Sequence, residues 1–263
     1  MIMRRHVFPQ RLDAESVLKE ARGLLASRVE EPSRRAFLTR TLTLGGVALL
    51  SGCRLSDNAS VETALSAISR WNDRVQGWIF DPRALAPTYP ESMITRPFPF
   101  NAYYGVDEAP AVDEAGFRLE VTGRVADRRD WRLDELRALP QTEQITRHIC
   151  VEGWSAIGRW GGVRFSDFLA RVGADTSARY VGFECADDYY TSIDMATALH
   201  PQTLLALTYD GRMLPREYGF PMKLRMPTKL GYKNPKHVQA IYVTDTYPGG
   251  YWEDQGYNWF GGS

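Results

Sequence analysis

The sequence predicts a mixed α+β fold, in which short strands and short helices interleave without a regular alternation. Residues 117–123 alternate apolar and polar side chains as a half-buried strand does, whereas residues 180–185 are typical of a buried strand. Residues 165–172, which lie between them, have the spacing and the Ser-Asp opening of a short helix. The glycines match neither a dinucleotide-binding nor a P-loop fingerprint, so a doubly wound nucleotide-binding fold is not expected.

The other elements follow similar signals along the chain. Helices are expected over residues 56–78, 131–139, 165–172 and 194–199, and strands over residues 117–123, 145–151, 180–185, 204–209, 222–226 and 238–244. Prolines at 140 and 201 end two of the helices, because the residue before a proline disfavours helical backbone. Asp210-Gly211 supplies a tight turn after the strand at 204–209. The proline-rich stretch 81–99 predicts an extended segment that wraps the body.

The first 53 residues are predicted to be a twin-arginine export signal. Segment 33–38 reads Ser-Arg-Arg-Ala-Phe-Leu, and the uncharged apolar run at 42–50 that follows it is too short to span a bilayer. The alternative is an amphipathic helix in which the two arginines are adjacent by chance. The twin-arginine route carries folded proteins, so this signal predicts a cofactor that is loaded before export and a periplasmic location.

Cys53 closes the apolar run in the order Leu-Ser-Gly-Cys, which resembles the lipobox of bacterial lipoproteins. Lipidation of Cys53 would anchor the mature protein to a membrane without a spanning helix. The alternative is an ordinary signal-peptide cleavage site that happens to have a cysteine beside it. Because the stretch before Ser33 is long, translation could also begin at a residue after Met1. Residues 54–100 are then a helix followed by the proline-rich segment, and residues 101–263 form the catalytic domain.

The overall charge does not by itself indicate a class of charged partner. Lys plus Arg and Asp plus Glu both number 32, so the overall charge points to neither nucleic acid nor an anionic surface. The three cysteines are too few for a disulfide scaffold.

Cys150 is the candidate reactive residue, because it ends a predicted strand and precedes a glycine turn. An inert buried thiol is the ordinary alternative. A cysteine protease would need an opposed histidine, and His148 on the same strand would lie parallel to the thiol. Zinc would need a Cys/His quartet, which the chain lacks. A single thiolate suits a metal whose other positions are filled by a sulfur-rich cofactor.

Three segments together resemble the molybdopterin-binding domain of the sulfite oxidase superfamily. They are 150–155 (CVEGWS), 231–236 (GYKNPK) and 101–104 (NAYY), and the resemblance extends over about residues 101–246. The most similar branch is the exported bacterial one typified by the catalytic subunit of protein-methionine-sulfoxide reductase. The resemblance implies an α+β fold of several small mixed sheets with peripheral helices, which encloses the cofactor.

The resemblance also implies the cofactor, molybdenum-molybdopterin, and its ligands. Cys150 would be the catalytic thiolate that binds molybdenum beside the two dithiolene sulfurs. By the resemblance, Asn101, Tyr104 and Gly105 would contact the pterin. Gly231, Tyr232 and Lys233 would bind its phosphate. Backbone amides of a tight loop and a lysine suit a phosphate dianion.

Three positions depart from the pattern of the relatives. Cys185 stands where the related reductase has a threonine, Lys223 stands where relatives have an arginine, and Tyr218 stands where an asparagine is expected. Contact with the pterin at these positions is therefore open. Cys185 also allows an alternative in which it forms a disulfide with Cys150.

The expected reaction is the reduction of sulfoxides, either small molecules or protein side chains. The chain has no Cys-x-x-Cys-His haem motif, so a separate carrier, expected to be a membrane-bound haem protein, would supply electrons. The short stretch after Lys233 implies a monomeric catalytic unit without the dimerisation domain of animal and plant sulfite oxidases. Oxidation of sulfite and a non-catalytic envelope lipoprotein that retains the scaffold remain the alternatives.

Overall fold

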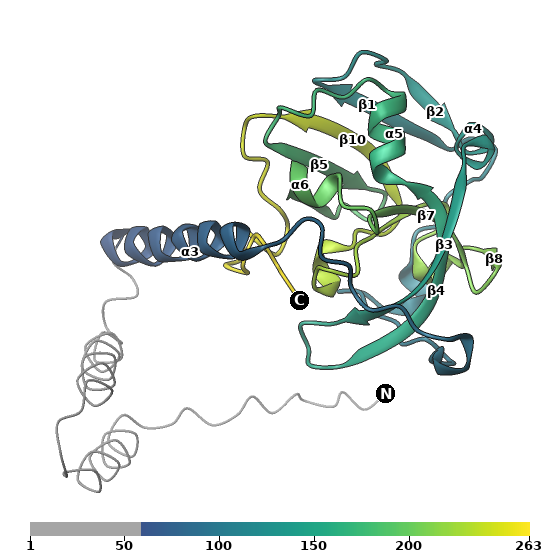
Figure 1. Ribbon diagram of the computed structural model, residues 1–263, viewed down its shortest axis with the longest axis horizontal. Helices are drawn as coiled ribbons and strands as arrows, with labels where there is room; N and C mark the ends of the chain where they lie inside the picture. Colours follow the sequence, from purple (N-terminus) through teal and green to yellow (C-terminus); the bar gives the residue numbers. More distant parts are fainter. Residues whose placement is uncertain (1–58) are drawn as a thin grey trace, which may run out of the picture. The chain divides into compact units, whose positions relative to one another are not determined.

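Two five-stranded β-sheets organise residues 59–263, which are the part of the chain that this computed structural model describes (Figure 1). The predicted export signal and Cys53 lie outside the described residues. The combination of sheets with few, mostly short helices confirms the α+β class that the sequence predicts.

The first sheet has the order β2-β1-β10-β5-β6. Its strands are β1 (Arg118–Gly123), β2 (Asp130–Arg132), β5 (Tyr180–Cys185), β6 (Tyr190–Asp194) and β10 (Val238–Thr244). Strands β1 and β10 are parallel, with Val121 opposite Ile241, and the other pairs are antiparallel. Leu119 and Val121 are buried and their neighbours are not, as the alternation predicts.

The second sheet has the order β3-β4-β7-β8, and β9 pairs with residues 204–206 of β7, whereas β8 pairs with residues 208 and 209. Its strands are β3 (Gln141–Ile149), β4 (Ser155–Arg164), β7 (Leu204–Tyr209), β8 (Arg212–Met213) and β9 (Lys223–Arg225). Strands β3 and β4 form a long hairpin whose loop begins at Cys150. The Cys150 backbone N–H donates to Trp154 O at 2.9 Å, which closes this loop.

Strand β4 is the largest element that the sequence analysis missed. Glycine is depleted in strands, and β4 contains three glycines, so its composition argues against a strand. The reason for the glycines lies in β7. A Cβ at Gly162 would overlap the carbonyl oxygen of Leu205, and the pairing with β7 shifts register between Gly161 and Gly162.

The helices are α3 (Ala59–Ile79), α4 (Leu133–Ala138), α5 (Phe165–Arg171) and α6 (Met195–Ala198), with short 3₁₀ turns at Glu91–Met93, Val106–Glu108, Arg216–Tyr218 and Gly231–Lys233. The helix predicted over 131–139 is shorter than expected, because Trp131 and Arg132 belong to β2. Glu135 accepts a hydrogen bond of 2.9 Å from the Arg132 backbone and so starts the helix two residues late. None of the described helices is long and apolar enough to cross a membrane.

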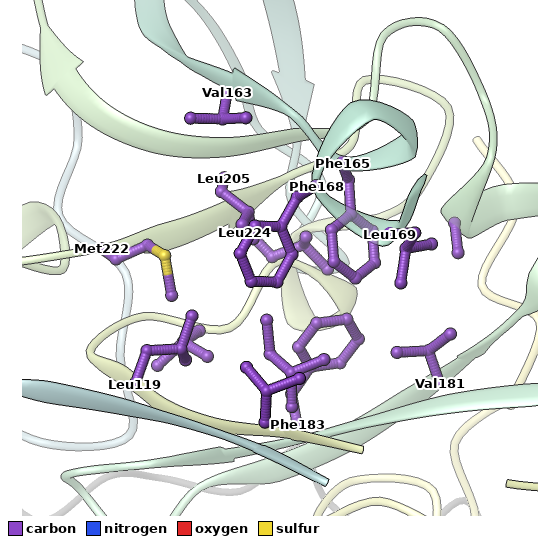
Figure 2. Packing of buried hydrophobic residues seen from close by; sticks show 14 of the residues in the cluster. Leu119, Val163, Phe165, Phe168, Leu169, Val181, Phe183, Leu205, Met222 and Leu224 are labelled. Carbon is purple, nitrogen blue, oxygen red and sulfur yellow. The ribbon is translucent and has the colours of Figure 1, made fainter. Parts of the chain in front are cut away.

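The main core lies where helix α5 packs between the two sheets (Figure 2). Phe165 and Phe168 from α5 meet Leu119 and Phe183 from the first sheet and Leu224 from the second. All five side chains are fully buried, and burial of each contributes roughly 1.5–3 kcal/mol. This core holds the two sheets, and the loops at their ends, as one rigid scaffold.

The proline-rich segment wraps the second sheet, as predicted. Tyr89 N donates to Ile145 O at 3.0 Å, and Thr95 N donates to Ile157 O at 2.8 Å. Phe98 is then buried in an aromatic cluster with Trp160, Tyr209 and Tyr218. These contacts bring the next residues, which begin at Asn101, to the end of the β3–β4 hairpin.

Candidate cofactor site

A cavity of about 150 Å³ opens beside the loop that joins β3 to β4. Five of the residues predicted from the sequence line it: Asn101, Tyr104, Cys150, Gly231 and Tyr232. They come from three distant parts of the chain. The structure therefore brings the three sequence segments of the predicted site together around one space.

Cys150 presents its thiol to this cavity from the first position of the hairpin loop. Its Sγ lies 3.5 Å from Glu152 Oε2, and this carboxylate oxygen also accepts a hydrogen bond of 2.9 Å from Trp154 Nε1. Burial raises the pKa of Cys150, and the neighbouring Glu152 charge raises it further. Cys150 and Cys185 are both free thiols, so the alternative disulfide does not form.

Gly231 allows the 3₁₀ turn Gly231–Lys233 to approach the floor of the cavity closely. A Cβ at this position would lie 2.8 Å from His148 Nε2 and 3.4 Å from Asn101 Nδ2. His148 is buried, and neither ring nitrogen has a hydrogen-bond partner among the described residues. Burial, and then the nearby Arg225 guanidinium, lower the pKa of His148 well below its usual value, so the ring is neutral.

Three buried basic residues, Arg225, Lys223 and Lys236, lie close enough to His148 for their charges to lower its pKa. No carboxylate of the described residues lies within 4.0 Å of any of them. Burial lowers the pKa of Arg225 to about 9 and that of Lys236 to about 8, and it lowers the pKa of Lys223 well below the usual value. Uncompensated buried charge is costly, so this cluster favours an anion.

Two of these cations are held by neutral partners. Arg225 donates to Arg147 O at 2.6 Å and to Asn234 Oδ1 at 3.1 Å. Lys236 donates to Glu217 O at 2.8 Å, and its Nζ lies 4.2 Å from the centre of the Phe100 ring. Lys236 lines the cavity, whereas Lys223 and Arg225 are not among its lining residues.

Lys233 does not reach the cavity. Its Nζ donates to Ser192 O at 2.6 Å and forms an ion pair with Glu253 inside the protein. The lysine that the structure offers to a phosphate is therefore Lys236, three residues later in the same motif. The sequence analysis singled out Lys233 because it completes the Gly-aromatic-Lys pattern, and only the fold shows which lysine faces the cavity.

Three other positions that the sequence analysis named lie outside the cavity lining. Gly105 begins a 3₁₀ turn, where its N–H donates to Glu108 Oε2 at 2.7 Å. Cys185 ends β5 and is buried, and burial raises the pKa of this thiol well above its usual value. Tyr218 donates to Phe98 O at 2.8 Å and packs into the aromatic cluster of the second sheet.

The cavity mouth contains residues that the sequence analysis missed. Tyr104 donates a hydrogen bond of 2.8 Å to Asp187 Oδ2, and Tyr103 donates to the Asp187 backbone oxygen. The Tyr103 ring stacks on Tyr251, with 5.1 Å between centroids. The other lining residues outside the quoted motifs are Tyr189, Trp252 and Tyr257, whereas Ala102, Asn234 and Pro235 lie within those motifs but had no assigned role. Tertiary packing alone brings Tyr189, Trp252 and Tyr257 to the site, so no local pattern marks them.

Comparisons with known proteins show the family to which the chain belongs. Residues 106–252 match the family model described as "Oxidoreductase molybdopterin binding domain". A relative from Azospira oryzae, described as a putative protein-methionine-sulfoxide reductase subunit YedZ1, is 69% identical over 255 residues, which is 97% of each chain. The protein-methionine-sulfoxide reductase catalytic subunit MsrP of Ralstonia nicotianae is 28% identical over 79% of this chain and 73% of its own.

Among solved structures, the sulfane dehydrogenase SoxCD from Paracoccus pantotrophus matches with a TM-score of 0.49 and 21% identity. The match covers 52% of this chain and 40% of that one.

The residues around the cavity fit a molybdopterin cofactor. Cys150 offers the soft thiolate that such a metal accepts, and Lys236, which lines the same cavity, suits the anionic phosphate. Gly231 and Asn101 both line the cavity, and the missing Cβ at Gly231 leaves space beside Asn101 Nδ2. The chain is thus a member of the oxidoreductase molybdopterin-binding domain family, an α+β oxidoreductase that works with a molybdenum-molybdopterin cofactor.

Proposed function

We propose that this protein reduces sulfoxides, with methionine sulfoxide in proteins as the leading substrate. The names of its relatives from Azospira oryzae and Ralstonia nicotianae support this reaction class. The observation that carries the proposal is the position of Cys150, a free thiol that lines the same cavity as the buried Lys236.

The residues of the chain would divide the work as follows. Cys150 holds the metal, and Lys236 with the backbone of residues 234–236 holds the phosphate. When bound, the cofactor exchanges an oxygen atom and two electrons with the substrate. Reduction of a sulfoxide to a thioether also consumes two protons and releases water, so the chain must hold protons at the cavity.

Two groups are placed to hold these protons. The Glu152 carboxylate lies 3.5 Å from Cys150 Sγ, beside the metal position. Burial, and then the hydrogen bond to Asp187, raise the pKa of Tyr104 far above its usual value, so its hydroxyl keeps its proton at neutral pH.

Loading the cofactor would require the cavity wall to move. Ligand pockets usually offer roughly 300–1,000 Å³, and the cavity measures about 150 Å³. The wall at residues 101–104 has no helix or strand, and Tyr103 is exposed, so this segment is the one to move outward. Amide hydrogen exchange at 101–104 should then differ between cofactor-free and loaded protein, while exchange in the core strand β5 stays the same. Equal exchange at 101–104 in the two forms would contradict this movement.

The cellular setting completes the proposal. The twin-arginine segment at 33–38 supports export to the periplasm after cofactor loading, and Cys53 supports a lipid anchor. Electrons would come from a haem protein in the membrane, because the sequence has no haem-attachment motif of its own.

A two-direction assay tests the reaction. Purified, molybdenum-loaded protein is mixed with a reduced viologen dye and either free or protein-bound methionine sulfoxide, and separately with sulfite and an oxidising dye. We expect dye oxidation with the sulfoxides and little reaction with sulfite. Sulfite oxidation without sulfoxide reduction would replace the proposed reaction, and inactivity in both directions with full molybdenum content would favour a non-catalytic protein.

A further inference from the structure

Helix α3 presents an apolar stripe to solvent. Ile68, Trp71, Trp78 and Ile79 are 54%, 61%, 85% and 69% exposed. Their spacing of three, seven and one residues places all four on one face of the helix. We call these four residues the Trp stripe. A soluble monomer normally turns such a face inward, so an exposed one marks an interaction surface.

The opposite face of α3 is the one that contacts the rest of the protein. Asp73 Oδ1 accepts hydrogen bonds of 2.6 Å from Asn258 Nδ2 and 3.1 Å from the Phe260 backbone. Just beyond the helix, Phe80 packs edge-on against the Phe260 ring, with 5.4 Å between centroids. These contacts orient the helix, so the Trp stripe points away from the protein.

The apolar surface continues past the end of the helix. Leu85 is 63% exposed, and with Ile79 it lines a groove of about 700 Å³ that also borders Pro87, Ile149 and Phe260. An occupant of the Trp stripe would therefore extend over this groove.

Charge and position together indicate what covers this surface. Arg70 and Arg74 are both exposed and lie along one side of the Trp stripe. Tryptophan beside arginine on an amphipathic helix is typical of helices that lie in the interface of a membrane with anionic lipids. The apolar run at 42–50 and Cys53 immediately precede α3 in the chain.

We infer that the Trp stripe docks α3 flat on the surface of an anionic phospholipid bilayer. This surface holds the enzyme at the membrane in addition to any lipid on Cys53, and it lies on a different element from the cofactor cavity. The inference depends on the exposed helix and not on the proposed reaction. Reductase activity on a soluble sulfoxide, measured on the same samples, therefore separates a failure of one from a failure of the other.

Vesicle flotation of the full chain tests the inference. The probes are vesicles of phosphatidylcholine with and without phosphatidylglycerol. Trp71→Ser/Trp78→Ser should lower binding to the anionic vesicles about tenfold or more, because two buried aromatic side chains are lost from the interface. The matched control is Met93→Ser/Met213→Ser, which removes two exposed apolar side chains outside α3 and should bind like the parent protein.

Fluorescence quenching by brominated phospholipids reports contact of the stripe with lipid directly. Bound parent protein should be quenched more than bound Trp71→Phe/Trp78→Phe, in which the other tryptophans remain. Equal quenching, or flotation of the serine variant like the parent, overturns the inference. So does a self-associated parent protein that becomes monomeric in the serine variant, because the stripe would then be a protein interface.

Discussion

Lys233 and Glu253 form an ion pair in which both side chains are only 1% exposed. Lys233 also donates to Ser192 O, and Glu253 also accepts from Thr191 at 2.7 Å, so the pair joins the 3₁₀ turn beside the cavity to strand β6 and to the segment after β10. The pair explains why the lysine of the Gly-Tyr-Lys motif stabilises the fold and leaves the cavity to Lys236.

Lys233→Met should therefore lower the free energy of unfolding of the protein without altering the cavity. Breaking a buried ion pair from one side leaves the other charge unpaired and typically costs about 3–5 kcal/mol. The measurement is the free energy of unfolding in urea. Lys236→Met is the matched control, because Lys236 has no carboxylate partner within 4.0 Å. If the two variants were equally stable, the structural role of Lys233 would be wrong.

The pH dependence of the free energy of unfolding should show that the pKa of Lys236 is lowered in the folded protein. Burial lowers its pKa from 10.5 to about 8 in the folded protein. Between pH 8 and pH 10.5 the unfolded chain holds this proton and the folded chain has released it, so stability rises with pH across that window. In cofactor-free protein, Lys236→Met should remove a rise on the order of 3 kcal/mol. The difference between the stability-versus-pH curves of the parent protein and Lys236→Met separates the effect of Lys236 from that of the other buried lysines. Parallel curves would contradict the lowered pKa of Lys236.

Gly162→Ala should strongly destabilise the second sheet. The added Cβ would overlap Leu205 O and force β4 away from β7, which we expect to cost about 3 kcal/mol or more. Gly77→Ala, within helix α3, is the matched control, because the added Cβ would lie at an ordinary contact distance of 3.7 Å from the Phe260 ring. This variant should stabilise the protein by up to ~1 kcal/mol, because alanine favours a helix more than glycine does. Thermal unfolding of both variants checks the prediction, which fails if Gly162→Ala melts with the parent protein.

Glu152→Gln should raise the reduction potential of the bound metal. The carboxylate lies 3.5 Å from Cys150 Sγ, and removal of its negative charge favours the reduced metal by roughly 50 mV. Redox titration followed by electron paramagnetic resonance measures the shift. Glu143→Gln, an exposed carboxylate on the neighbouring strand β3, should leave the potential unchanged. Equal potentials in the parent and Glu152→Gln would show that Glu152 does not face the metal.

The sequence predicted the outline of the fold and the centre of the site, but not the surroundings of the site. Strand β1 was predictable because its apolar side chains alternate, and Cys150 because a recognisable motif surrounds it. Strand β4 was missed because its glycines serve contacts with β7 that local propensity does not record. The choice between Lys233 and Lys236 depends on the position of Glu253, which is distant in sequence and adjacent only in the folded protein.

Metal analysis of the protein tests the central role of Cys150 most directly. The parent protein and the matched variant Cys185→Ser, which alters a buried thiol outside the cavity lining, should both purify with close to one molybdenum per chain. Cys150→Ser should fold equally well and lose nearly all of the metal, because a serine hydroxyl does not replace a soft thiolate ligand. Full molybdenum content in Cys150→Ser would contradict the assignment of Cys150 as the metal ligand.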